Sequence, residues 1–140
     1  MSGVYARNRK SSEMQFYKVG QELQMEITKY VMNEKRVPKK WRYNIGNKMI
    51  ATVDSMMDNI IAANSIFPTN DELLKRRNIY QVYANNNCYQ LQNQLIRLHN
   101  CVPTATIKSL LKIIQLLHQE KNLIKGWKKS NKIMTVKEKD

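Results

Sequence analysis

Three places in the chain gather basic side chains, and at one of them an aromatic ring, in a pattern suited to binding polyanions. Lysine and arginine contact phosphates, and an aromatic ring beside them can stack on a base. The chain has 24 Lys and Arg against 11 Asp and Glu, a net charge of +13. This imbalance favours nucleic acid, an anionic membrane surface or an acidic protein face as a partner. The candidate binding residues are Lys39, Lys40, Trp41, Arg42, Lys75, Arg76, Arg77, Lys125, Lys128 and Lys129.

The segment that follows Pro38 is the most informative of these places. Proline suits the first turn of a helix, so Lys39, Lys40 and Arg42 are expected at a helix N-terminus. The macrodipole disfavours cations there. Because helix formation does not ask for this arrangement, we interpret the charge as kept for a partner. Two simpler interpretations stand beside it: a solvated basic surface, and packing of Trp41 across the preceding turn.

Catalytic and metal-binding patterns are weak by comparison. His99 and His118 have no acid at a fixed spacing, and Cys88 and Cys101 form no close pair. Glu22 and Glu26 share a helix face but lack the Glu-x-x-His motif of a di-metal bundle. A phosphate-binding glycine loop is missing as well. We therefore expect a protein that is not an enzyme and needs neither a metal nor a cofactor.

The composition of the chain also indicates the cellular compartment in which the protein is expected. No run approaches the roughly 18 apolar residues of a transmembrane helix, and Met1 to Ser12 lacks the apolar region of a signal peptide. Two unpaired cysteines suit a reducing environment. These features predict a cytoplasmic protein without a membrane partner.

Four helices must position these residues, because apolar side chains recur at spacings of three and four between proline-containing turns. Ser12 with Gln15 and Thr69 with Glu72 have the spacing of capping boxes. The expected ranges are about 12–35, 38–65, 69–98 and 104–130. The expected core residues are Phe16, Leu23, Ile27, Tyr30, Ile45, Met49, Val53, Met56, Ile60, Leu73, Tyr80, Ala84, Asn87, Leu91, Leu95, Leu98, Ile107, Leu110, Ile114, Leu117, Ile124 and Trp127.

Short connections make consecutive helices antiparallel neighbours. The prediction is an all-α, up-down-up-down four-helix bundle over residues 11–130, preceded by a basic arm (1–10) and followed by a charged, frayed tail (131–140). This topology gathers Lys39, Lys40 and Arg42 near one end of the bundle. It gathers residues 75–77 and 125–129 near the other end.

Two predicted helices carry more apolar or uncharged surface than the core of a single bundle would cover. Ile50, Met57 and Ile61 form a second apolar stripe on the second helix, and residues 78–96 of the third helix carry no charge. A solvent-facing helix normally carries charged residues on its outer face. We expect these surfaces to contact a second subunit or another protein.

Several motifs together resemble the accessory variability determinant proteins of diversity-generating retroelements, over about residues 14–130. They are Pro38-Lys-Lys-Trp-Arg42, Gly46, Ala62-Ala-Asn64 and Leu123-Ile-Lys-Gly-Trp-Lys-Lys-Ser130. The same broad fold family includes proteins encoded by intervening sequences of bacterial large-subunit (23S) ribosomal RNA genes. The chain departs from these patterns by lacking their Asn-Ile-Ala-Glu-Gly segment and by carrying Lys125 before Gly126.

The resemblance implies a homopentameric barrel of four-helix bundles that binds a dedicated reverse transcriptase and nucleic acid. Such a protein supports mutagenic copying of a template RNA into complementary DNA without being a polymerase. The alternative from a different class is a stand-alone RNA-binding or ribosome-associated bundle without an enzyme partner. A third possibility is a protein that binds anionic membrane surfaces.

Overall fold

The computed structural model describes the backbone of residues 2–135 and the side chains of residues 15–135. It is all-helical over this range, with no strand. The elements in chain order are α1 (Ser2–Met32), α2 (Lys39–Trp41), the π-helical turn η1 (Arg42–Gly46), α3 (Asn47–Asn64), α4 (Asp71–Cys101) and α5 (Ile107–Lys129). Because α2, η1 and α3 follow without a break, the described chain forms four rods, as the sequence predicts.

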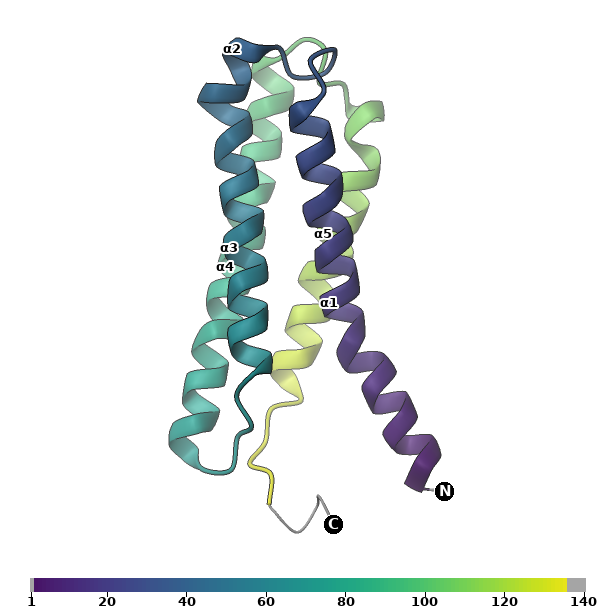
Figure 1. Cartoon of the computed structure of the whole chain (residues 1–140), viewed down its shortest axis with the longest axis vertical. Coiled ribbons are helices and arrows are strands. Elements are labelled where there is room, and N and C mark those ends of the chain that lie inside the picture. Colours follow the sequence, from purple (N-terminus) through teal and green to yellow (C-terminus); the bar gives the residue numbers. More distant parts are fainter. Residues whose placement is uncertain (1, 136–140) are drawn as a thin grey trace.

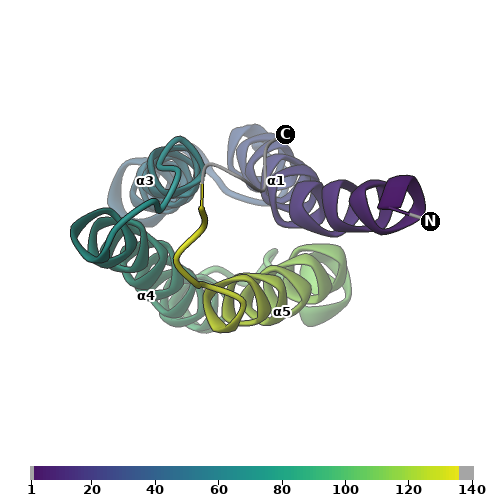
Figure 2. The ribbon, with the colours of Figure 1, turned by 90° about the horizontal axis from the view of Figure 1, so that it is seen from below.

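The four rods run alternately up and down (Figure 1). Viewed along the bundle, α1 lies beside α3, α3 beside α4, α4 beside α5, and α5 again beside α1 (Figure 2). We call the end with turns 33–38 and 102–106 the upper end, and the end with turn 65–70 the lower end, as they stand in Figure 1. The predicted bundle topology is confirmed.

Helix starts differ from the sequence expectation in two places. The α1 backbone is already helical at Ser2, so the predicted helix start at Ser12 is wrong. The side chains of the predicted basic arm, residues 1–10, lie outside the described residues. The α4 cap is Asn70 rather than Thr69: its Oδ1 accepts a hydrogen bond from the Leu73 amide at 2.9 Å. Either side chain can cap a helix, and spacing alone did not distinguish them.

Two glycines let α1 approach its neighbours closely. A Cβ atom on Gly20 would collide with the Glu120 carboxyl of α5 and with Met57 Sδ of α3. A Cβ atom on Gly46 would lie 2.6 Å from Val31 Cγ1 of α1. Alanine would fit at neither position without displacing a neighbouring helix or side chain. Gly20 therefore lies where α1 comes into close contact with α3 and α5.

The core matches the predicted stripes on the first two rods more closely than on α4 and α5. On α4, the predicted core residues Leu73, Tyr80 and Asn87 are only half-buried. Ile107 and Ile114, expected in the core, are 53% and 37% exposed, whereas Ile113 and Leu116 are buried instead. The inward face of α5 therefore lies beside the predicted stripe. The second stripe of α3 is divided: Met57 is buried, Ile50 packs against the core, and Ile61 is exposed. It does not form the continuous outer surface that we expected.

The tail folds back onto the bundle where the structure describes it. Asn131 exchanges side-chain hydrogen bonds with Gln81, which is fully buried on α4. The Met134 amide donates to the Pro68 carbonyl at 2.9 Å. The expectation of a frayed tail is therefore wrong for residues 131–134, because the buried Gln81 amide needs a polar partner. Residues 136–140 lie outside the described part.

Glu120 is the most unusual core residue. It is fully buried, and neither carboxyl oxygen has a hydrogen-bond partner among the residues that the structure describes. Burial raises the pKa of this carboxyl from 4.5 to about 9, so Glu120 is protonated and neutral at pH 7. A neutral acid avoids the large cost of an unpaired buried charge.

This protonation makes stability depend on pH. The folded protein keeps a proton that the unfolded chain loses above the ordinary carboxyl pKa, so the free energy of unfolding falls as pH rises from about 4.5 toward 9. The limiting slope is about 1.4 kcal/mol per pH unit. Glu120→Gln should remove this contribution, as measured by urea unfolding between pH 5 and 8.5.

The matched control is Glu72→Gln, because the Glu72 side chain is 80% exposed. It should keep the wild-type pH profile. Parallel profiles for the wild-type and Glu120→Gln proteins would contradict a protonated Glu120 in the core.

Candidate nucleic-acid interface

At the upper end, two arginine side chains donate hydrogen bonds to backbone carbonyl groups. Arg42 Nε donates to the Val31 carbonyl at 3.2 Å, and Arg42 Nη2 donates to the Met32 carbonyl at 3.3 Å. Arg36 Nη1 donates to the Thr104 carbonyl at 3.2 Å, which ties the two upper turns together. A guanidinium at the C-terminus of α1 complements the negative end of that helix. The interpretation that the local fold has no use for the Arg42 charge is therefore wrong.

The other upper candidates divide between core and surface. Trp41 is half-buried and packs against the core, in line with the simpler interpretation of its role. Lys39 and Lys40 are exposed, and Lys40 Nζ lies 5.5 Å from the centre of the Trp41 ring. The upper end thus offers two solvent-facing lysines on α2, together with the exposed ring of Tyr43.

At the lower end, adjacent arginines have different surroundings. Arg77 is half-buried: its guanidinium lies 5.4 Å from the centre of the Trp127 ring, and its Nη1 donates to the Ile66 carbonyl at 3.5 Å. Trp127 stacks on Phe16 with ring centres 3.9 Å apart. Arg76 is exposed, and its Nη2 atom lies 3.9 Å from Glu72 Oε1. Lys75 is exposed as well. Arg77 therefore connects α4 to the lower turn and to α5, while Lys75 and Arg76 face solvent.

Three of the predicted lysines meet in one groove. Lys125, Lys128 and Lys129 of α5 line a groove of about 390 Å³ whose other wall is α4. All three are exposed, and no acidic residue occurs in residues 121–135. We call this feature the lysine groove; it is lined by Asn78, Val82, Asn85, Ile124, Lys125, Lys128 and Lys129.

The lysine groove continues along α5 beyond the predicted residues. Lys121 Nζ lies 4.3 Å from the centre of the Tyr89 ring on α4, and Lys125 Nζ lies 5.9 Å from it. Lys132 follows the helix and is exposed. Sequence reasoning missed Lys121, Lys132 and Tyr89 as possible contacts. The spacing of Lys121, Lys125 and Lys128, four and then three residues, could have indicated a continuous row on one helix face.

Two arrangements at the lower end favour phosphate over an acidic small molecule. The cations are spread along a helix rather than converging on one point, which suits a linear polyanion. The Asn78 and Asn85 amides beside them add hydrogen-bonding groups for sugars or bases. The groove can therefore follow a nucleic-acid backbone over several phosphates, without a fixed sequence requirement.

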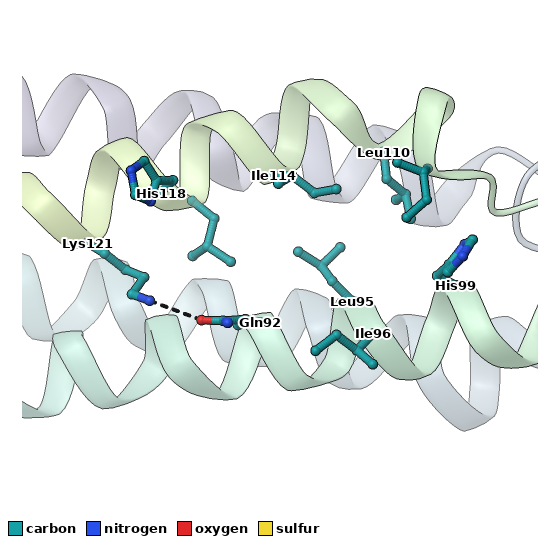
Figure 3. A pocket seen from close by; sticks show the side chains of 10 residues that line it. Gln92, Leu95, Ile96, His99, Leu110, Ile114, His118 and Lys121 are labelled. Atoms are coloured by element: carbon teal, nitrogen blue, oxygen red, sulfur yellow. Dashed lines mark hydrogen bonds between the residues drawn. The ribbon is translucent and has the colours of Figure 1, made fainter.

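A second, apolar cleft lies between α4 and α5 above the lysine groove (Figure 3). Its volume is about 310 Å³. Leu95, Ile96 and Ile114 lie along its length, with His118 and Lys121 toward one end and His99 toward the other. Exposed apolar surface beyond the core does exist, as expected, but here it lies on α4 and α5. Further lining residues are Gln92, Ile107, Leu110 and Leu117.

The residues considered for catalysis are engaged elsewhere or isolated. His99 Nδ1 bonds to the Ala105 carbonyl at 2.8 Å in the upper turn, and His118 bonds to Asn122 on its own helix. Glu22 and Glu26 both pair with Lys112, at 3.7 and 2.9 Å. Among the described residues, no group of three His, Cys, Asp or Glu side chains is placed to hold a metal ion.

The helices of residues 2–135 include none with the length and apolar character needed to cross a membrane. Comparison of the chain with protein-family models, with curated proteins and with solved structures found no match. The resemblance noted from the motifs therefore stays an expectation.

The lysine groove predicts where polyanion binding is lost. Changing Lys125, Lys128 and Lys129 together to Gln should weaken binding of single-stranded RNA and flatten its salt dependence. Each phosphate contact contributes about −0.7 to the log–log slope on single strands, so three contacts account for about 2. Fluorescence anisotropy between 50 and 300 mM salt measures the slope.

The control is the triple change of Lys18, Lys29 and Lys48 to Gln, which removes the same charge from exposed positions outside the groove. Arg77 stays intact in both proteins because it supports the fold. Equal losses in the two triple variants would show that net charge, rather than the groove, drives binding.

Proposed function

We propose that this protein is a non-catalytic accessory subunit of a reverse transcriptase, one that binds template RNA or its DNA copy. The observation that carries the nucleic-acid half of the proposal is the lysine groove, where three exposed lysines share one channel with two asparagines. The polymerase half rests on the motif resemblance to accessory variability determinant proteins. In that setting the function is support of mutagenic complementary-DNA synthesis in a diversity-generating retroelement.

The mechanism we propose is positioning. Contacts to phosphates hold a nucleic acid without reading its sequence, which suits a subunit that must handle a changing template. If the same chain also contacts the polymerase, the template is kept at high local concentration beside the enzyme. Such a subunit raises the rate of synthesis without contributing a reacting group.

Self-association belongs to the same proposal, with the pentamer taken from the resemblance alone. The described surface that suits it best is the apolar cleft between α4 and α5, where Ile96 and Ile107 are more than half exposed. Packing against another copy would remove this surface from water. A ring of copies would also repeat the lysine groove, and repeated weak sites bind a long polyanion far more tightly than one site does.

A stand-alone RNA-binding bundle is the second candidate. The observation that favours it is that the lysine groove lies wholly within one chain, so nucleic-acid binding there needs no polymerase. The two candidates agree on the groove and differ only in whether a reverse transcriptase depends on it.

Reconstituted synthesis tests the proposal. A reverse transcriptase encoded in the genomic neighbourhood of this chain, given its template RNA, should make complementary DNA only when this protein is added. The Lys125, Lys128 and Lys129 triple Gln variant should restore much less synthesis than the Lys18, Lys29 and Lys48 variant, and the protein alone should make none. Equal synthesis without the protein would reject the accessory role and leave the stand-alone candidate.

A further inference from the structure

A further groove lies between α4 and the end of α3, on the face of α4 next to the lysine groove. Its volume is about 630 Å³, within the range of small-molecule binding sites. It shares no residue with the lysine groove. We call this feature the tyrosine pocket; it is lined by Ala62, Ser65, Ile66, Arg76, Ile79, Tyr80 and Tyr83.

Aromatic and apolar surface is exposed in the tyrosine pocket. Tyr83 is 51% exposed and Ile79 is 46% exposed, whereas Tyr80 is half-buried and packs against the core. The rings of Tyr80 and Tyr83 stand at 84° to each other, with their centres 6.4 Å apart. Tyr80 is therefore held in place by the bundle, while Tyr83 presents its ring to solvent. A planar aromatic group that enters the pocket can stack on this exposed ring.

Basic side chains accompany the exposed ring. Arg76 lines the pocket, and its side chain is 63% exposed. Its ion pair with Glu72 spans 3.9 Å on the helix surface, and an exposed pair of this kind contributes little free energy. A phosphate can therefore take the place of Glu72 beside the guanidinium. Lys75, exposed at the preceding position, adds a second cation. Aromatic rings beside cations are the combination with which proteins bind single-stranded nucleic acid.

The tyrosine pocket and the lysine groove flank the same turns of α4. Asn78 and Val82 line the lysine groove, and the residue that follows each of them, Ile79 and Tyr83, lines the tyrosine pocket. Consecutive residues are about 100° apart around a helix, so the two sites lie on neighbouring faces at the same height. Ile79 and Val82 are also neighbours on the helix surface, being three residues apart. A strand seated in the lysine groove therefore reaches the pocket by crossing this one helix.

We propose that the tyrosine pocket holds one unpaired base of the strand that is bound in the lysine groove. The base stacks on Tyr83 beside Ile79, and Arg76 contacts a neighbouring phosphate. This inference rests on the nucleic-acid half of the proposed function and adds that the preferred ligand is single-stranded. Bases inside a duplex are paired and stacked, so they cannot enter the pocket. Because every base has a face that can stack, binding stays tolerant of sequence.

The test compares a short single-stranded RNA with a duplex RNA of the same length, by fluorescence anisotropy at one salt concentration. Tyr83→Leu should weaken binding of the single strand at least about fivefold and leave binding of the duplex unchanged. Tyr83→Phe is the matched control, because it keeps the ring, and it should bind the single strand as the wild-type protein does. The triple Gln variant of Lys125, Lys128 and Lys129 should weaken binding of both ligands, because both carry phosphates.

A 2-aminopurine base placed in the single strand reports stacking directly, because its fluorescence falls when it stacks on another ring. Wild-type protein and Tyr83→Phe should quench this fluorescence, and Tyr83→Leu should not. Unchanged affinity of Tyr83→Leu for the single strand, equal losses for single strand and duplex, or quenching that persists in Tyr83→Leu would overturn the base-binding pocket and leave the lysine groove standing. Failure of the wild-type protein to bind single-stranded RNA would instead reject the nucleic-acid half of the proposed function, and this inference with it.

Discussion

The close approach of α1 to α3 and α5 at Gly20 is the constraint on which the arrangement of this bundle depends. Because position 20 carries no side chain, the Glu120 carboxyl and Met57 can occupy the space between the helices. Glu120 lies on the inward face of α5. Ile124 and Trp127 lie on the same face and are buried as well. One residue further along the helix, about 100° around its axis, stand Lys121, Lys125 and Lys128. The buried face of α5 therefore fixes the direction in which its lysines point, toward α4.

Arginine and lysine serve different purposes in this chain. Arg36, Arg42 and Arg77 donate to carbonyl groups at turns and helix ends, and Arg77 also lies over Trp127. A planar guanidinium with several donors suits such contacts. The lysines of α2 and of the lysine groove are exposed instead. A part of the high net charge is thus used inside the fold, whereas the charge of α2 and of the lysine groove that faces solvent is carried by lysine.

Much of the fold could be predicted from the sequence, because apolar spacing and prolines determine helices locally. The Ile45, Met49 and Val53 stripe is buried as expected. Prediction failed where a tertiary contact decides the outcome. Ile107 and Ile114 fit the helical period of α5, but the neighbouring Ile113 and Leu116 face the core.

At the candidate site, too, local features could be predicted from the sequence and tertiary contacts could not. The clustering of Lys125, Lys128 and Lys129 was visible in the sequence, but the α4 wall of the groove was not, since Asn78 and Asn85 join it only through helix pairing. The structural contacts of Arg42 and Arg77 were likewise hidden, because their partners lie 11 residues away along the chain and across a turn. The isolated Glu120 gave no sequence signal of burial, as a single charged residue on an otherwise amphipathic helix usually faces solvent.

The central claim is that nucleic acid binds along the lysine groove, and not in the apolar cleft above it. Photo-crosslinking of a 4-thiouridine RNA to the full chain, followed by mass spectrometry of the peptides, tests it most directly. Crosslinks should concentrate on Tyr89 and on Lys121 to Lys132, and they should disappear as salt is raised. Crosslinks that concentrate instead on Lys39 to Tyr43 at the upper end, or that scatter over all exposed lysines, would contradict the claim.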